Sequence, residues 1–280
     1  MPATFRVKAL AATAAASFSL ASPALAAPTG QPYPWQLNFQ PAASPVMANI
    51  ESFHTLLLWI ITAISVFVLA LLLWIVIRYN TRANPTPSRT EHNTLLEVMW
   101  TVVPVIILVI IAIPSFKLLY YEADIPKPAL TIEAIGKQWF WSYKYPKQNF
   151  QFDSLGLSDT DAAKRHEPRL LGVDNIIVVP VNQVVKVVTT GADVIHSWAV
   201  PAFGVKMDAV PGRLNETWFK ATQTGTFYGE CSELCGARHA FMPIEVKVVS
   251  QPEFDAWLAG AKKKFAAIDD KNTRLAALTQ

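Results

Sequence analysis

The chain has 280 residues, of which 52% are hydrophobic and 16% charged, and its formal net charge is +3 at pH 7. This composition is too apolar for an ordinary soluble protein, and the apolar excess is local. Between Glu122 and Gln280 there are 18 acidic and 18 basic residues, so this part carries no net charge and any electrostatic steering must come from a local patch. We expect no nucleic-acid partner.

Residues 1–26 have the features of a secretory signal peptide. Arg6 and Lys8 form a charged start, an Ala- and Leu-rich run follows, and the segment ends in an A-x-A cleavage pattern at Ala26. The apolar run is short and ends in small residues and Pro23, which favours a signal peptide over a third membrane helix. We therefore expect the chain to be exported and cut near Ala26.

Two long apolar segments are predicted to cross a membrane as helices. Residues 53–77 and 95–113 are each long enough for a hydrocarbon core of about 30 Å, which about 20 residues span. The loop between them carries three arginines, so the positive-inside rule places this loop in the cytoplasm and the rest of the chain outside. The mature chain then divides into a membrane hairpin, residues 27–124, and an external domain, residues 125–280.

The external domain is predicted to be all-β. Its apolar residues occur in short alternating runs separated by Gly, Pro, Asn and Asp, a pattern typical of an antiparallel sandwich or barrel. We expect residues 154–169 to form a surface loop. A short helix that Ser250 caps should follow the last strand, with a loose tail beyond Asp269. The predicted strands are residues 130–135, 139–145, 176–181, 184–190, 196–200, 216–221, 225–230 and 243–249.

Both cysteines of the chain lie in one segment that is dense in potential metal ligands. Cys231 and Cys235 are followed by His239 and Met242, a soft nitrogen and sulfur donor set that suits copper better than magnesium or calcium. A disulfide and a structural zinc site are the alternatives. A disulfide gives no role to His239 and Met242, and zinc has little use for a thioether.

The C-x3-C-x3-H-x2-M spacing, with His196 about 35 residues upstream, resembles the dinuclear copper (CuA) centre of subunit 2 of cytochrome c oxidase. The resemblance covers nearly the whole chain and implies a cupredoxin fold, a Greek-key sandwich or barrel, for the external domain. A mononuclear blue-copper site needs only one thiolate, so it would give the second cysteine no role. The resemblance implies two bridging ligands, Cys231 and Cys235, and four terminal ones, His196, His239, Met242 and the carbonyl of Glu233.

The resemblance also implies a function. The chain would accept electrons from a cytochrome c and pass them to the haem of subunit 1, where oxygen is reduced with proton pumping. Subunit 1, the other oxidase subunits, cytochrome c and membrane lipid are the implied partners, in the inner membrane of a bacterium with the copper domain on the periplasmic side. The side chain of Glu233 would share a magnesium or manganese ion with subunit 1.

Further site residues follow from the same resemblance. Alternating aromatic residues on a strand usually pack in a core, and we expect this of Trp141 and Tyr143. In the family, however, the tryptophan at the position of Trp139 is the one that receives electrons. Glu97, which by its position alone could be an interfacial carboxylate, would lie near a proton-uptake route. The implied docking acids for the cytochrome are Asp153, Asp174 and Asp193.

The sequence allows other functions to be considered. A quinol oxidase subunit resembles this chain in fold but lacks the copper ligands, and a nitrous oxide reductase needs a large additional propeller domain. The absence of a CxxCH motif argues against a fused haem c. A membrane-anchored copper chaperone or sensor belongs to a different class, which must release copper readily.

Overall fold

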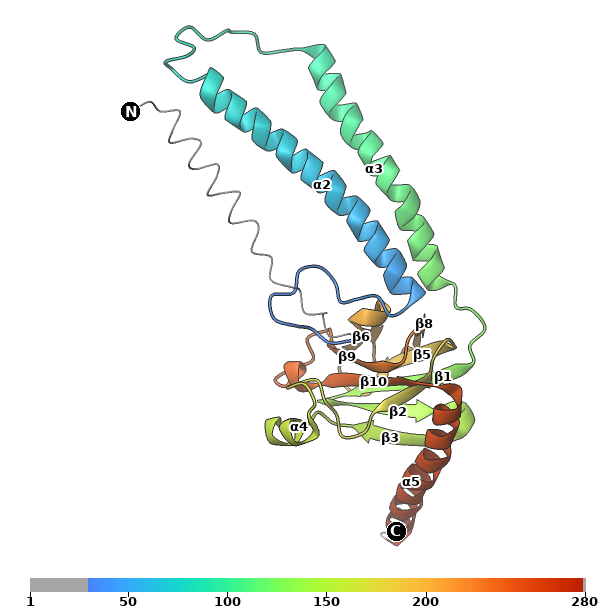
Figure 1. Cartoon of the computed structure of the whole chain (residues 1–280). Coiled ribbons are helices and arrows are strands. Elements are labelled where there is room, and N and C mark those ends of the chain that lie inside the picture. Colours follow the sequence, from blue (N-terminus) through green and yellow to red (C-terminus); the bar gives the residue numbers. More distant parts are fainter. Residues whose placement is uncertain (1–29, 279–280) are drawn as a thin grey trace.

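The computed structural model describes residues 30–278, and the predicted signal peptide, residues 1–26, lies outside the described residues. Two long helices rise from one side of a β-sandwich, and another helix leaves the sandwich at the C-terminal end (Figure 1). The predicted order of membrane hairpin, β-domain and C-terminal helix is therefore confirmed.

The two long helices are α2, Pro45–Arg78, and α3, Thr94–Ala123. Both contain a predicted span and, among the described residues, they are the two helices long and apolar enough to cross a membrane. At 1.5 Å per residue, the 34 residues of α2 extend well beyond a hydrocarbon core. No residue of α3 is buried within the chain, as expected for a helix that lipid or another membrane subunit surrounds.

The first turn of α2 is attached to the β-domain. The Ser44 hydroxyl accepts a hydrogen bond from the backbone N–H of Met47 and donates one to the carbonyl of Phe203 (2.7 Å). The first bond satisfies an otherwise unpaired N–H at the start of the helix. The second holds the outer end of the membrane hairpin against the domain.

The β-domain consists of two five-stranded sheets, ordered β3-β2-β1-β5-β8 and β4-β10-β9-β6-β7. Most neighbours are antiparallel, as expected, but β1 pairs with β5 and β4 with β10 in parallel. The strands are β1 (Leu130–Lys137), β2 (Phe140–Tyr145), β3 (Phe150–Ser154), β4 (Ile177–Pro180), β5 (Val184–Gly191), β6 (His196–Val200), β7 (Val205–Ala209), β8 (Asn215–Lys220), β9 (Gly225–Cys231) and β10 (Pro243–Val249).

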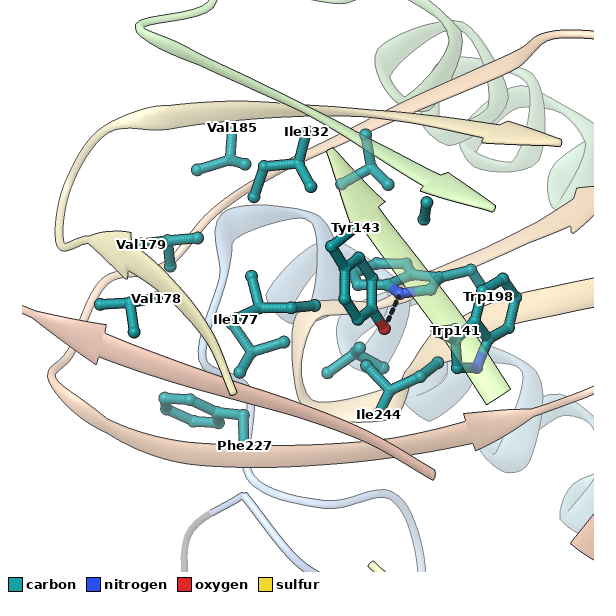
Figure 2. Close-up of a cluster of buried hydrophobic side chains, with 14 of the residues drawn as sticks. Ile132, Trp141, Tyr143, Ile177, Val178, Val179, Val185, Trp198, Phe227 and Ile244 are labelled. Atoms are coloured by element: carbon teal, nitrogen blue, oxygen red, sulfur yellow. Dashed lines mark hydrogen bonds between the residues drawn. The ribbon is translucent and has the colours of Figure 1, made fainter. Parts of the chain in front are cut away.

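Aromatic and aliphatic side chains together fill the space between the sheets (Figure 2). Trp141 and Tyr143 of β2 are fully buried, which confirms that they pack in the core. Trp198 of β6, in the other sheet, donates a hydrogen bond from its indole N–H to the Tyr143 hydroxyl (3.3 Å). Large buried aromatic rings dominate core energetics, and this bond also connects the two sheets.

The structure contains elements that the sequence reading did not anticipate. The eight predicted strands are all present, but β3 and β7 are additional. Helix α4, Asp159–Arg165, lies within the segment that was expected to be a loop; Ser158 caps it by accepting from the N–H of Asp161. A serine followed by acidic residues is a helix-start signal, so this prediction was wrong for a recognisable reason.

The C-terminal helix is longer than expected. Helix α5 covers Gln251–Leu278 and continues past Asp269, where we expected a loose tail, because no glycine or proline interrupts this part of the sequence. Phe254 and Phe265 are buried against the sandwich, and the ring of Phe265 stacks on that of Phe152 with centroids 4.7 Å apart.

One carboxyl group is buried in the sandwich away from both cysteines. Glu245 of β10 is 1% exposed, and its Oε2 accepts a hydrogen bond from the N–H of Val173 (3.0 Å). Burial raises the pKa of Glu245 to about 7, and the neighbouring Glu167 acts in the same direction, whereas Lys247 and the bond from Val173 oppose it. The folded domain therefore favours the protonated acid.

The sign of the resulting pH dependence can be tested with Glu245→Gln. Because the pKa is raised above its unfolded value, the stabilising contribution is fully present below about pH 4.5 and is lost as the pH rises through about 7. A shift of this size corresponds to about 3 kcal/mol. Glutamine stays neutral at every pH and keeps the acceptor. The thermal midpoint of Glu245→Gln minus that of the wild type should therefore be about 5–10 °C larger at pH 8 than at pH 5. Near-ultraviolet circular dichroism of the detergent-solubilised chain measures this difference, and parallel curves would contradict it.

Candidate metal centre

The two cysteines lie side by side and are not joined by a disulfide bond. Cys231 ends β9, Cys235 lies on the loop that follows, and their Sγ atoms are 3.8 Å apart with both thiols free. Both side chains are buried. The chain therefore presents two adjacent sulfur donors in a closed environment.

His196 joins the cysteines from the neighbouring strand. Its side chain, at the start of β6, is fully buried, and its Nδ1 lies 3.8 Å from the Sγ of Cys231. One potential ligand atom from each of His196, Cys231 and Cys235 lies within 4.8 Å of the others. The structure thus brings together three donors that the sequence separates by up to 39 positions (235 − 196).

The remaining predicted ligand residues lie next to the two cysteines and differ in burial. His239 begins a short 3-10 turn, with its Nδ1 3.6 Å from the Sγ of Cys235. Met242 is fully buried, and its carbonyl accepts a hydrogen bond from the N–H of Cys231 (3.1 Å). The carbonyl of Glu233 faces the Sγ of Cys231 (3.4 Å), while Glu233 as a residue is exposed. The carbonyl and the side chain of Glu233 therefore lie in different surroundings.

The electrostatics favour one thiolate and one thiol in this pair. Burial opposes ionisation of Cys231, but its hydrogen bonds with His196 and with backbone groups lower the pKa of the thiol to about 6. Burial and the neighbouring Cys231 raise the pKa of Cys235. A bound cation would supply the charge that the second thiolate needs, because thiols bind metals in the deprotonated form. The buried nitrogen and sulfur donor set fits copper.

Asp193, predicted as a docking acid, lies directly behind His196. Its Oδ1 is 2.8 Å from the Nε2 of His196 and also accepts from the N–H of Val194 (2.7 Å), while Oδ2 accepts from the N–H of Gln138 (2.7 Å). The carboxylate therefore fixes the ring of His196 so that Nδ1 faces the cysteines, an arrangement typical of metal-binding histidines. The sequence reading missed this contact, although the i, i+3 spacing to His196 was a signal for it.

Trp139 lies beside the cysteine loop. Its side chain is half-buried, packs against the core, and donates a hydrogen bond from Nε1 to the carbonyl of Cys235 (3.2 Å). The structure therefore joins this tryptophan to a ligand-bearing residue while part of its ring stays exposed. The sequence reading also missed the adjacent Gln138, which donates to the same carbonyl.

The other two predicted docking acids lie around the edge strand β3. Asp153 accepts from the hydroxyl of Ser142, and Asp174 accepts from the N–H groups of Leu155 and Asn175 (both 2.7 Å). The Asn175 side chain also donates to the carbonyl of Asp153 (2.9 Å). The structure thus places these two acids near one another, both in exposed positions.

Glu97 is not part of this site. It lies in the first turn of α3, at the end farthest from the sandwich (Figure 1). Its Oε1 accepts a hydrogen bond from the N–H of Asn93 (3.3 Å) and lies 3.7 Å from the Nδ1 of His92. Within this chain, its visible role is to cap the helix.

Comparison with known protein families agrees with the fold. The family model described as cytochrome C oxidase subunit II, transmembrane domain, matches residues 32–118, and the one described as the periplasmic domain of the same subunit matches residues 130–249. The chain belongs to the cytochrome c oxidase subunit 2 family. It is a membrane protein with an outer-side β-domain, and membership of a subunit family implies an oxidase complex with further subunits.

Relatives match over most of this length. A probable cytochrome c oxidase subunit 2 of Rickettsia bellii is 52% identical over 248 residues, 88% of this chain and 91% of the relative. Cytochrome c oxidase subunit 2 of Cereibacter sphaeroides is 45% identical over 270 residues, 90% of this chain and 88% of the relative. The crystal structure of the periplasmic domain of subunit II of the Bradyrhizobium japonicum cytochrome oxidase is 62% identical and covers 51% of this chain and 99% of that domain, with a TM-score of 0.48.

Proposed function

We propose that this chain is the subunit through which electrons enter a cytochrome c oxidase, receiving them from a cytochrome c and passing them to the haem of subunit 1, where oxygen is reduced to water with proton pumping. The observation that carries the proposal is the convergence of His196 with two free, buried cysteines in a chain of this family. We place the subunit in the inner membrane of a bacterium, with the β-domain on the periplasmic side and lipid around the helices.

The residues of the site fit a dinuclear copper centre. Cys231 and Cys235 would bridge two copper ions, and the shared thiolates would let one electron spread over both. His196, His239, Met242 and the carbonyl of Glu233 would supply the terminal ligands. The protein's own contribution is to hold these donors in fixed positions, because a ligand frame that changes little between redox states lowers the reorganisation that electron transfer requires.

The burial of His196 and both cysteines argues against a copper chaperone or sensor. His196 is 0% exposed, Cys231 5% and Cys235 3%. A chaperone must release copper to a partner, which requires ligands that the partner can reach. Ligands enclosed to this degree favour a permanent metal centre.

Metal analysis of the purified oxidase complex tests the copper proposal. The wild type should contain two copper ions in the β-domain with a mixed-valence spectrum. Cys231→Ser should abolish that spectrum, because a bridging ligand is lost, whereas Met242→Leu should retain copper with an altered spectrum, because a thioether is the weakest ligand.

We also propose that the carboxylate of Glu233 binds magnesium or manganese with subunit 1, so Glu233→Ala should lose that ion and keep copper. A single copper ion in the wild type, or retention of the magnesium or manganese ion in Glu233→Ala, would contradict the respective assignment.

Trp139 is the proposed point at which electrons enter, and Asp153, Asp174 and Asp193 are proposed to dock the cytochrome. The half-buried side chain of Trp139, which donates a hydrogen bond to the carbonyl of Cys235, supports the first role. Trp139→Gln should slow electron transfer severely in stopped-flow measurements while leaving cytochrome affinity nearly unchanged. Asp174→Asn should instead weaken binding in a salt-dependent way, because it alters the encounter rate. Normal transfer in Trp139→Gln would refute this role.

Glu97 is proposed to lie at the start of a proton-uptake route into subunit 1. Glutamine can still accept the hydrogen bond from Asn93 but cannot carry a proton, so Glu97→Gln separates proton uptake from helix capping. We expect severalfold slower steady-state turnover with unchanged copper content and cytochrome affinity. Glu91→Gln, which changes an exposed carboxylate in the loop before α3, is the matched control and should turn over normally. Equal turnover in both variants would leave Glu97 with the capping role alone.

A further inference from the structure

The turn between β1 and β2 reaches the metal centre from the opposite sheet. It consists of Gln138 and Trp139, because β1 ends at Lys137 and β2 begins at Phe140. The two cysteines and His196 belong instead to the second sheet and its loops. The turn is therefore placed to connect the sheets at the pole where the ligands gather.

Gln138 makes a hydrogen bond toward each ligand-bearing segment. Its side-chain Nε2 donates to the carbonyl of Cys235 (2.9 Å), and its backbone N–H donates to Oδ2 of Asp193 (2.7 Å). The other oxygen of Asp193 is the one that faces the Nε2 of His196 (2.8 Å). A single residue thus connects the cysteine loop to the histidine that faces it.

Two glycines allow this close approach. A Cβ atom on Gly136 would lie 2.6 Å from the ring of His196, so β1 can pass beside the histidine only without a side chain there. Gly236 has a φ of +120°, and a Cβ on it would meet Nε2 of Gln138 and the ring of Trp139 at 3.2 Å. The backbone at both points is adapted to let the turn lie against the ligand segments.

We propose that Gln138 is a positioning residue of the metal centre, which holds the Cys235 loop at a fixed distance from His196 through the Cys235 carbonyl and the Asp193 carboxylate. It acts through these two groups and is not a ligand itself. The distance between the Cys235 loop and His196 on β6 would determine whether the cysteine and histidine donors can bind the same pair of metal ions. The inference rests on the proposed copper centre for its spectroscopic test but not for its test on the metal-free chain.

The test uses Gln138→Met in the full detergent-solubilised chain, because methionine has a similar length and cannot donate. In the metal-free chain, the backbone amides of residues 236–242 should exchange with solvent about three- to tenfold faster than in the wild type, the change expected when one hydrogen bond of ordinary net strength is lost. After loading with copper(II) sulfate, a chelator should remove copper faster by a similar factor, and the visible spectrum should shift. The thermal midpoint of the β-domain should change little.

Gln151→Met is the matched control, since Gln151 is exposed on β3 and far from the described contacts of the centre. It should match the wild type in all of these measurements. Gln138→Lys, which keeps a donor, should restore much of the slow exchange. Asp193→Asn addresses the second connection, and in this variant the amides near His196 should exchange faster, so the proposal stays testable even when Gln138→Met does not accumulate.

The outcomes separate this inference from the proposed function. If the wild type binds two copper ions but Gln138→Met shows wild-type exchange, spectrum and copper release, the positioning role is refuted and the function stands. If the wild type binds no copper pair, the proposed function fails, and the amide exchange of the metal-free chain still decides whether Gln138 holds the loop.

Discussion

The pairing of β6 with β9 is the contact on which the candidate metal centre depends. In this pair Trp198 lies opposite Cys231, and the N–H of Ser232 bonds to the carbonyl of Ser197 (2.9 Å). A shift of one residue would turn every side chain of the strand to the other face, so that His196 and Cys231 would no longer meet. The buried ring of Trp198 opposes such a shift, because it fits between the sheets and bonds to Tyr143.

The same strand connects the metal centre to the membrane hairpin. At the end of β6 opposite to His196, the turn around Ala202 and Phe203 accepts hydrogen bonds from the N–H of Ala43 (2.8 Å) and from the hydroxyl of Ser44. At the other helix, the indole N–H of Trp218 donates to the carbonyl of Glu122 (3.1 Å). Two helices fixed to the domain in this way restrict its tilt over the membrane. A domain that passes electrons into a membrane partner requires such a fixed distance.

The features that the sequence predicted well are those that local chemistry determines. The membrane spans follow from continuous hydrophobicity, and the closeness of Cys231, Cys235 and His239 follows from their spacing within one segment. Several missed features depend on tertiary packing, whereas helix α4 carried a local start signal at Ser158. The short strand β7 and the parallel pairing of β1 with β5 leave weak local signals, and the role of Gln138 depends on a turn from one sheet meeting a loop of the other. For Asp193 the residue was singled out, but its contact with His196 became visible only in three dimensions.

The arrangement around Trp139 resolves a conflict between two requirements of an electron-accepting centre. The ligands must be buried, because a closed and rigid environment limits reorganisation, yet an external donor must come close to them. Here the cysteines and His196 are enclosed, while the half-exposed ring of Trp139 contacts the carbonyl of Cys235 and shares it with Gln138. Two donors on one carbonyl restrain the loop more than either does alone. If Trp139 is the entry point, as proposed, the partly exposed residue is hydrogen-bonded to the same carbonyl as Gln138, so the proposed ligands could stay closed to solvent while the path from the donor remains short.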